Sequence, residues 1–232
     1  MGRPTEIAPD VFRVDAIAFS NAISVLLVRE SGGFTLFDTG VSGSPKRILA
    51  ALRDLGAGPL DLKRIFLTHY HDDHTGGLEE MVEHSGAQVW ASDREAEIFT
   101  GERPPDLSAN PFIKRMSGGF VPPKVEVARR LRDGEMIAGF RAVPTPGHTL
   151  GHVSLLRDKD GLLFAADAFG SLPLKLRVGV RKAFCTDPVQ AKKSASDLLA
   201  EPFDTAVFAH GKTLKTDAKE TLRKVVAECG YA

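Results

Sequence analysis

The most informative stretch of this chain reads Thr68-His69-Tyr70-His71-Asp72-Asp73-His74-Thr75-Gly76-Gly77. It follows the short apolar run 65–67, which predicts a buried strand, and it precedes residues 78–82, whose Leu, Met and Val recur at helical spacing. Three of the seven histidines fall within six positions, together with Asp73. The sequence therefore predicts a cluster of imidazoles and a carboxylate on a strand-to-helix loop.

The spacing of these side chains suits metal binding. Residues two apart in an extended segment point to the same side, so His69 and His71 can share one cation. Asp73 and His74 follow one turn later and can face a second cation. Imidazole nitrogen and carboxylate oxygen suit Zn, Fe(II), Mn or Co, and no thiolate forces the choice. The alternative is a solvated polar turn, which accounts less well for the clustered histidines.

The composition is that of an ordinary globular protein. The chain has 232 residues, of which 43% are hydrophobic and 26% are charged. Lys plus Arg and Asp plus Glu each number 30, so no net charge favours nucleic acid or an anionic membrane. Two cysteines are too few for a disulfide framework, and the N-terminus lacks the apolar stretch of a secretory signal. We therefore expect a soluble, cytoplasmic protein.

The pattern along the chain predicts two sets of strands with helices outside them. The first set comprises 11–14, 23–28, 34–37, 65–67 and 88–91, with helices over about 45–55, from 78, and from a Ser92 cap to about 99. The second comprises 125–131, 136–143, 153–156 and 162–165, followed by helices over 191–199 and 219–229 that flank a strand at 206–208. We expect a mixed α/β chain with two packed sheets.

Two segments lack clear periodicity and are candidate substrate loops. Residues 101–123 are rich in Pro, Gly and Asn and carry Phe112, Met116 and Phe120. Residues 168–184 contain no acid and combine apolar with basic side chains, namely Phe169, Leu172, Leu174, Leu176, Lys175, Arg177, Arg181 and Lys182. Phe169 and Arg177 are the candidate substrate-binding residues, in an apolar pocket with a basic rim. The alternatives are a solvated loop or the contact of a homodimer.

Five landmarks then occur in one order along the chain. They are Phe37-Asp38-Thr39-Gly40, the histidine stretch, Thr145-Pro146-Gly147-His148-Thr149, Leu163-Phe164-Ala165-Ala166-Asp167 and Ala209-His210-Gly211. In these landmarks, and in the H-x-H-x-D-H pattern of the histidine stretch, the chain resembles the metallo-β-lactamase-fold hydrolases. The resemblance implies one domain over residues 1–232 with the four-layer αββα sandwich of that family.

The resemblance also implies a dinuclear metal site. His69, His71 and His148 correspond to ligands of the first ion, Asp73, His74 and His210 to ligands of the second, and Asp167 to the bridge between them. Two divalent ions are implied, with zinc preferred over iron or manganese. Asp38 would orient a ligand histidine through its other ring nitrogen, the alternative being a turn carboxylate. His84 and His152 lie outside this set, and we expect a surface and a structural role for them.

The implied chemistry is hydrolysis. Two cations lower the pKa of a bridging water from about 15.7 toward about 7, so that a hydroxide nucleophile is present at neutral pH, and Asp73 could handle the proton. Small esters, lactones or thioesters are the expected substrates, without nucleic acid or membrane as a partner. The bridging Asp167 that the resemblance implies argues against antibiotic hydrolysis. Glyoxalase II has Gly-His-Glu where this chain has Ala209-His210-Gly211, and many homoserine-lactone hydrolases have Tyr where it has Phe169. Each of these differences makes one specific substrate less favoured, but esters and lactones remain possible as a class. The alternatives are a mononuclear iron sulfur dioxygenase, a phosphodiesterase or a non-catalytic metal-binding protein.

Overall fold

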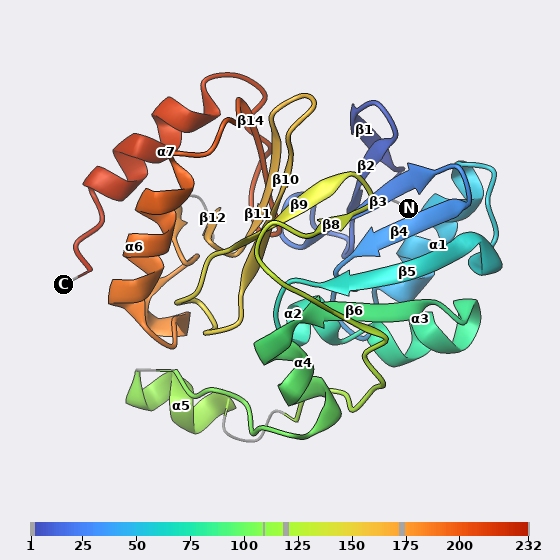
Figure 1. Ribbon diagram of the computed structural model, residues 1–232, viewed down its shortest axis with the longest axis horizontal. Helices are drawn as coiled ribbons and strands as arrows, with labels where there is room; N and C mark the ends of the chain where they lie inside the picture. Colours follow the sequence, from blue (N-terminus) through green and yellow to red (C-terminus); the bar gives the residue numbers. More distant parts are fainter. Residues whose placement is uncertain (1–2, 109, 118–120, 172–174, 232) are drawn as a thin grey trace. The chain divides into compact units, whose positions relative to one another are not determined.

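The computed structural model describes residues 3–108, 110–117, 121–171 and 175–231. The chain divides into two compact units (Figure 1). Unit 1 comprises Met1–Pro104 and Pro122–Leu131, and unit 2 comprises Pro105–Val121 and Arg132–Ala232. Each unit has a β-sheet and its own helices, as two separate sets of strands predict.

Unit 1 contains a seven-stranded sheet whose strands follow chain order from β1 to β7. The first four strands form an antiparallel meander, and β5, β6 and β7 add in parallel. Their bounds are Thr5–Ala8, Val11–Asp15, Ser24–Glu30, Gly33–Phe37, Leu62–Leu67, Gln88–Ser92 and Arg129–Leu131. The meander can use short turns, whereas each parallel step needs a crossover, so the helices enter only after β4.

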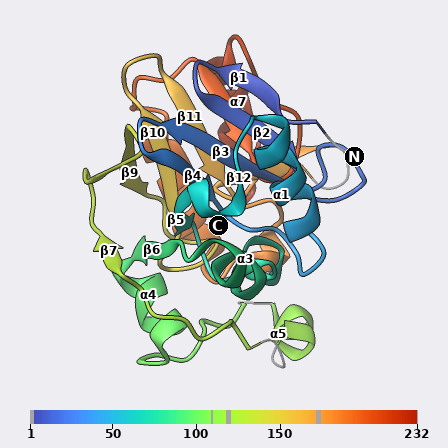
Figure 2. The same ribbon diagram turned by 90° about the vertical axis from the view of Figure 1, so that its right-hand side faces the viewer.

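Two helices of unit 1 end at glycines, and one of these two begins at a serine cap. The helices of unit 1 are α1 (Pro45–Asp54), η1 (Pro59–Asp61), α2 (Asp72–Thr75), α3 (Leu78–Ser85) and α4 (Asp93–Thr100). The Ser92 hydroxyl accepts from the Glu95 N–H at 3.4 Å, so it caps α4. Gly86 and Gly101 end α3 and α4 in the left-handed conformation, which glycine adopts without strain. In Figure 2, α1 and α3 lie in front of the strands of this sheet.

Unit 2 contains a five-stranded sheet in the order β14-β11-β10-β9-β8 and a two-stranded sheet of β12 and β13. The strands β8 to β14 are Met136–Ile137, Phe140–Pro144, Val153–Arg157, Leu162–Ala166, Phe169–Ser171, Leu176–Val178 and Thr205–Phe208. The helices are α5 (Pro111–Ser117), η2 (Lys182–Phe184), α6 (Pro188–Leu198) and α7 (Ala218–Ala227). Buried faces of α6 and α7 join Leu163, Phe169 and Phe208 in one hydrophobic cluster, which is the core of this unit.

The structure differs from the sequence prediction at two predicted strands. Residues 125–131 were expected in the second sheet, but only Arg129–Leu131 are a strand, and they pair in parallel with β6 of unit 1. The run 136–143 is a hairpin of β8 and β9, because Ala138 and Gly139 adopt φ of 50° and 79° and turn the chain. The apolar residues of this run favoured one continuous strand and gave no signal for the turn.

Both candidate loops contain regular structure. Helix α5 lies within 101–123 and begins directly after Asn110, whose side-chain oxygen accepts from the N–H groups of Phe112 and Ile113 at 3.0 and 3.2 Å. Strands β12 and β13 lie within 168–184 and pair antiparallel. Ser108 of the first segment donates to the Ala183 carbonyl of the second at 2.6 Å. The two segments are therefore in contact within unit 2.

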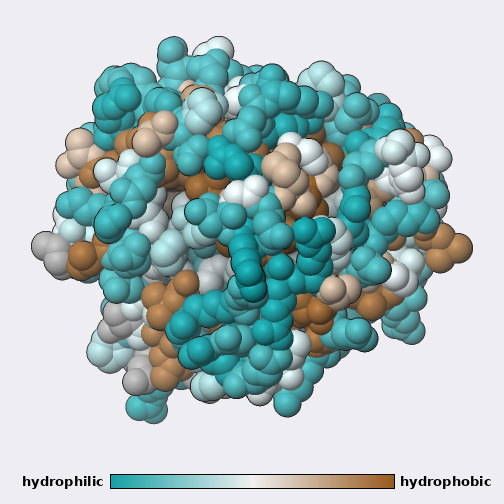
Figure 3. Space-filling model, viewed as in Figure 1, coloured by the Kyte–Doolittle hydropathy of each residue, from teal (hydrophilic) through white to brown (hydrophobic). Residues whose placement is uncertain are grey.

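The surface shown in Figure 3 is mostly hydrophilic, with hydrophobic side chains in small groups, as is usual for globular proteins. Among the described residues, no helix combines the length and apolar character that crossing a membrane requires.

Candidate metal centre

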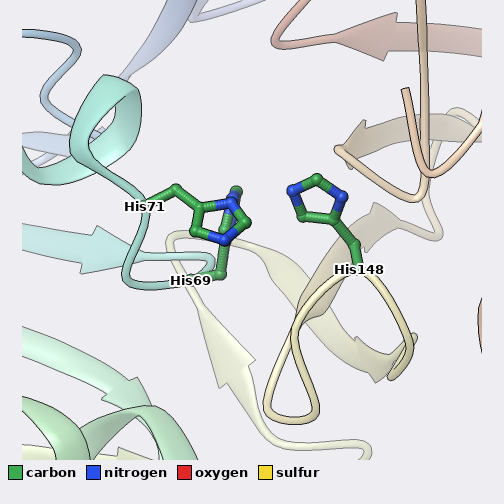
Figure 4. A group of neighbouring side chains, drawn as sticks. All are labelled: His69, His71 and His148. Carbon is green, nitrogen blue, oxygen red and sulfur yellow. The ribbon is translucent and has the colours of Figure 1, made fainter. Parts of the chain in front are cut away.

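The histidine loop of unit 1 begins directly after β5. His69 is fully buried, and its Nε2 lies 3.1 Å from the Nδ1 of His71. Figure 4 shows the two rings next to each other beyond the end of β5. Two imidazole nitrogens that bind one zinc ion tetrahedrally at 2.0–2.1 Å stand about 3.3 Å apart. The separation of His69 and His71 thus fits a shared cation, as their spacing in the sequence predicts.

His74 lies on α2, the short helix that follows. Its ring is buried and its centroid is 4.0 Å from that of His69. Asp73, the preceding residue, keeps 29% of its side chain exposed, with an oxygen 3.9 Å from the Nε2 of His74. The turn into α2 therefore brings Asp73 and His74 beside the first two histidines.

Asp38 holds this loop from the end of β4. One carboxylate oxygen lies 2.8 Å from the Nδ1 of His74, and the other accepts from the backbone N–H of Thr68 at 2.9 Å. The hydroxyl of Thr68 also lies within 3.0 Å of both oxygens. A carboxylate accepts the Nδ1 proton, which leaves the Nε2 lone pair of His74 available for a metal. Asp38 adopts a φ of 61°, an uncommon conformation outside glycine.

The glycine pair that ends the motif is required by close packing. A Cβ on Gly77 would lie 2.6 Å from the carbonyl oxygen of Thr39, and one on Gly76 would lie 2.7 Å from the nitrogen of Ser42. Thr39 also donates its N–H to the carbonyl of His74 at 2.7 Å. The loop after β4 and the histidine loop are therefore in direct backbone contact.

Unit 2 brings together the other three predicted ligands. His148 lies between β9 and β10, Asp167 directly follows β11, and His210 follows β14. One oxygen of Asp167 is 3.3 Å from the Nε2 of His148 and 3.5 Å from the Nε2 of His210. All three residues are at most 3% exposed. A single carboxylate thus stands between two imidazoles contributed by distant segments.

Two neighbours orient these ligands. The Nδ1 of His148 is 3.2 Å from the carbonyl oxygen of Gly179 and can only donate to it. His152 accepts from the backbone N–H of Asp167 at 3.1 Å, and its other ring nitrogen lies 2.8 Å from the Thr145 hydroxyl. His152 therefore has the structural role expected from the sequence. His84 is exposed on α3, as expected for a surface residue.

The candidate substrate-binding residues lie in different surroundings. Phe169 is fully buried in the hydrophobic cluster of unit 2, where it packs with core residues. Arg177 is partly exposed on β13 and donates to the Lys175 carbonyl at 3.2 Å. Phe112 is 69% exposed on α5. Phe120, Leu172, Leu174 and the side chain of Met116 lie outside the described residues.

Sequence reasoning did not identify Thr68 and Gly179 as supports of the site. Thr68 lies inside the quoted motif, and a hydroxyl next to the first histidine was the available signal. Gly179 acts through its backbone carbonyl, for which no side chain gives a sequence signal.

The predicted donors fit divalent metal ions by their chemistry. His69, His71, Asp73 and His74 of unit 1 and His148, Asp167 and His210 of unit 2 are all side chains that could hold a metal ion. They offer imidazole nitrogen and carboxylate oxygen, which suit zinc, iron and manganese.

Comparison with known proteins agrees with this chemistry. Residues 20–210 match the model of the metallo-β-lactamase superfamily. The uncharacterized protein YobT of Bacillus subtilis (strain 168) is 32% identical over 88% of this chain and 89% of its own length. The probable metallo-hydrolase YflN of the same organism is 31% identical over 66% of this chain and 61% of its own length.

A hydroxyacylglutathione hydrolase of Methylobacillus flagellatus is 31% identical over 68% of this chain, and the match covers 51% of that enzyme. The chain therefore spans about half the length of this relative. A solved mutant of a metallo-β-lactamase from Cronobacter sakazakii superposes with a TM-score of 0.72 and 25% identity, covering 98% of this chain and 93% of that chain. The family, the mixed α/β fold and the prediction of an enzyme are confirmed: the chain belongs to the metallo-β-lactamase superfamily and is an enzyme of that fold.

Proposed function

We propose that this protein is a dinuclear metal-dependent hydrolase of small esters, lactones or thioesters. In this proposal His69, His71 and His148 bind one ion, and Asp73, His74 and His210 bind the other. Asp167 bridges the two. The observation that carries the proposal is the position of the Asp167 carboxylate, which has His148 and His210 at 3.3 and 3.5 Å from the same oxygen. A bridge between the two ions needs a carboxylate close to an imidazole ligand of each, and this oxygen meets that requirement.

Bound divalent ions would supply a hydroxide nucleophile at neutral pH and would polarise the substrate carbonyl. The chain's own residues have three tasks. Asp38 and the Gly179 carbonyl hold the Nδ1 protons of His74 and His148, so that both histidines present Nε2 to the metals. The buried histidines exclude bulk water, which strengthens the electrostatic interactions around them. Asp73 is the predicted ligand with a partly exposed carboxylate, so it can accept a proton and return it to the leaving group.

The substrate class rests on two further observations. Lys175, Arg177, Arg181 and Lys182 give the segment after β12 a positive charge, which suits a substrate with an anionic end. Several relatives are named hydroxyacylglutathione hydrolases, whose name describes hydrolysis of a glutathione thioester. We propose a small molecule as the partner, not nucleic acid or a membrane, with zinc as the first choice of metal and iron or manganese as alternatives. A homodimer and a cytoplasmic location, in keeping with two free cysteines, complete the proposal.

Elemental analysis of the purified protein, followed by a substrate panel, tests this proposal. We expect close to two zinc, iron or manganese ions per chain, and metal-dependent hydrolysis of at least one ester, lactone or thioester that a chelator abolishes. One iron per chain with oxygen uptake in the presence of a persulfide would instead identify a sulfur dioxygenase. Cleavage restricted to phosphodiesters would identify a phosphodiesterase. A metal-loaded protein that turns over no member of the panel would refute the proposed activity.

A further inference from the structure

The segment after β13 packs against the loop that carries His148 and hydrogen-bonds to it. The backbone N–H groups of Thr186 and Asp187 donate to the carbonyls of His148 and Gly147, both at 2.9 Å. The carbonyl of Gly179 accepts from the His148 ring. Both the backbone and the imidazole of His148 are therefore positioned by residues 179–187.

The Gly179 carbonyl lies in a tight turn of unfavourable conformation. The N–H of Arg181 donates to this same oxygen at 2.5 Å, which closes a three-residue turn around Val180. Gly179 and Val180 adopt φ of 59° and 60°. A β-branched residue rarely adopts a positive φ, and such a conformation persists only where the surrounding structure enforces it. Val180 is 1% exposed, so the turn is packed into unit 2.

Tyr231, near the end of the chain, contacts this turn on both of its flanks. Its hydroxyl donates to the carbonyl of Val178 at 2.9 Å, directly before Gly179. The ammonium group of Lys182, directly after Arg181, lies 5.7 Å from the centre of its ring. The Tyr231 carbonyl in turn accepts from Lys192 of α6 at 3.3 Å. Partial burial raises the pKa of Tyr231 above its ordinary value, so the phenol keeps the proton it donates.

We propose that Tyr231 is a positioning residue, which holds the turn at 179–181 so that the Gly179 carbonyl fixes His148 with its proton on Nδ1 and its Nε2 lone pair free for a metal. The link to catalysis rests on the proposed function, but the link to the imidazole does not. Because the residue acts through the backbone, its removal is expected to change the state of His148 while the fold remains intact.

The first experiment uses the metal-free protein with ¹⁵N-labelled histidine at pH 8, where NMR distinguishes the two imidazole tautomers. The variants are Tyr231→Phe, which loses the hydroxyl, and Tyr231→Ala, which also loses the ring. Arg223→Gln is the matched control, because it alters an exposed charge on α7 that pairs with Glu220 of the same helix. The signal of His148 is assigned from its loss in His148→Asn.

We expect a single Nδ1–H tautomer for His148 in the wild type and the control, and a mixture with Nε2–H in Tyr231→Ala. In competition with a chromophoric chelator, zinc affinity should fall about 3- to 10-fold in Tyr231→Phe and about 10- to 100-fold in Tyr231→Ala. A His148 signal and zinc affinity that are unchanged in both variants would overturn the inference, and Tyr231→Phe decides it if Tyr231→Ala fails to fold. A wild type that binds no divalent ion would refute the proposed function, and the tautomer comparison would still decide the role of Tyr231.

Discussion

The carboxylate of Asp38 lies 2.8 Å from the Nδ1 of His74, and both residues are 1% exposed. The elements α1, η1 and β5 lie between the two residues along the chain, yet the same carboxylate also accepts from the Thr68 N–H. One buried acid therefore ties the end of β4 to both ends of the histidine motif. This arrangement makes Asp38 a support of the loop as well as a partner of a candidate ligand.

Asp38→Asn should weaken both metal binding and the fold. The amide has one acceptor oxygen in place of two, so it cannot accept from both the His74 ring and the Thr68 N–H, and one of these buried donors is left facing an NH2 group. Zinc affinity should fall about 10- to 100-fold. Chemical denaturation should show a loss of about 1–3 kcal/mol, because buried donors lose a charged acceptor. Asp54→Asn, an exposed acid at the end of α1, is the control and should change neither quantity. If Asp38→Asn and Asp54→Asn had the same zinc affinity and the same free energy of unfolding, Asp38 would not be a support of the metal centre.

Gly77→Ala tests the backbone contact beneath the motif. Gly77 has a φ of −94°, which alanine adopts freely, so any effect comes from the methyl group that would lie 2.6 Å from the Thr39 oxygen. We expect a loss of about 1–3 kcal/mol, and a Tm lower by about 2–12 °C in a scanning calorimeter. Gly43→Ala is the matched control, because its Cβ would meet nothing within 4 Å. A Tm equal to that of the control would show that the loop can move aside.

Local patterns predicted the motif and most elements because the residues that form them are neighbours in sequence. The H-x-H-x-D-H spacing predicted the histidine loop. The position of Ser92 before a helical pattern predicted that it caps α4. The strands of the meander follow from β-branched runs with turn residues between them. In each case the physical cause lies within about ten residues.

The remaining differences depend on partners that the local pattern does not identify. Arg129–Leu131 belong to unit 1 because they pair with β6, which lies almost forty residues earlier. The Asn110 cap of α5 was a readable signal, but the surrounding prolines and glycines favoured a loop. The position of the Gly179 carbonyl and the positive φ of Val180 depend on packing in unit 2. Neither can be predicted from the types of the residues involved.

The two cysteines should differ sharply in reactivity. Burial raises the pKa of Cys185 to about 12, with a further contribution from the charge of Asp167, whereas Cys229 is partly exposed. At pH 8 only about one Cys185 in ten thousand is then a thiolate. Iodoacetamide followed by mass spectrometry should modify Cys229 first and Cys185 only on unfolding. Fast labelling of the native Cys229→Ser variant would contradict this burial.

The same shift makes stability depend on pH in the alkaline range. The thiol has a pKa of 9.0 in its ordinary state and about 12 in the folded protein, so only the unfolded chain releases this proton between those values. The Cys185 contribution to stability is therefore complete below pH 9 and declines as the pH rises toward 12, by at most about 1.4 kcal/mol per pH unit. Urea denaturation at a series of pH values should show a shallower decline in Cys185→Ala. Parallel curves for the two proteins would contradict the shift.

Removing a candidate ligand should abolish turnover without unfolding the protein. His148→Ala and Asp73→Ala should each lower kcat/KM by at least about two orders of magnitude and reduce the metal content per chain, because each removes a donor that this chemistry requires. His84→Ala and Asp72→Ala are the matched controls, since both side chains are exposed and Asp72 is the immediate neighbour of Asp73. Circular dichroism checks that all four variants are folded. If His148→Ala keeps wild-type activity after its metal has been stripped, hydrolysis does not depend on the proposed metal site. The proposed role of Asp167 as a bridge between two ions would then be wrong as well.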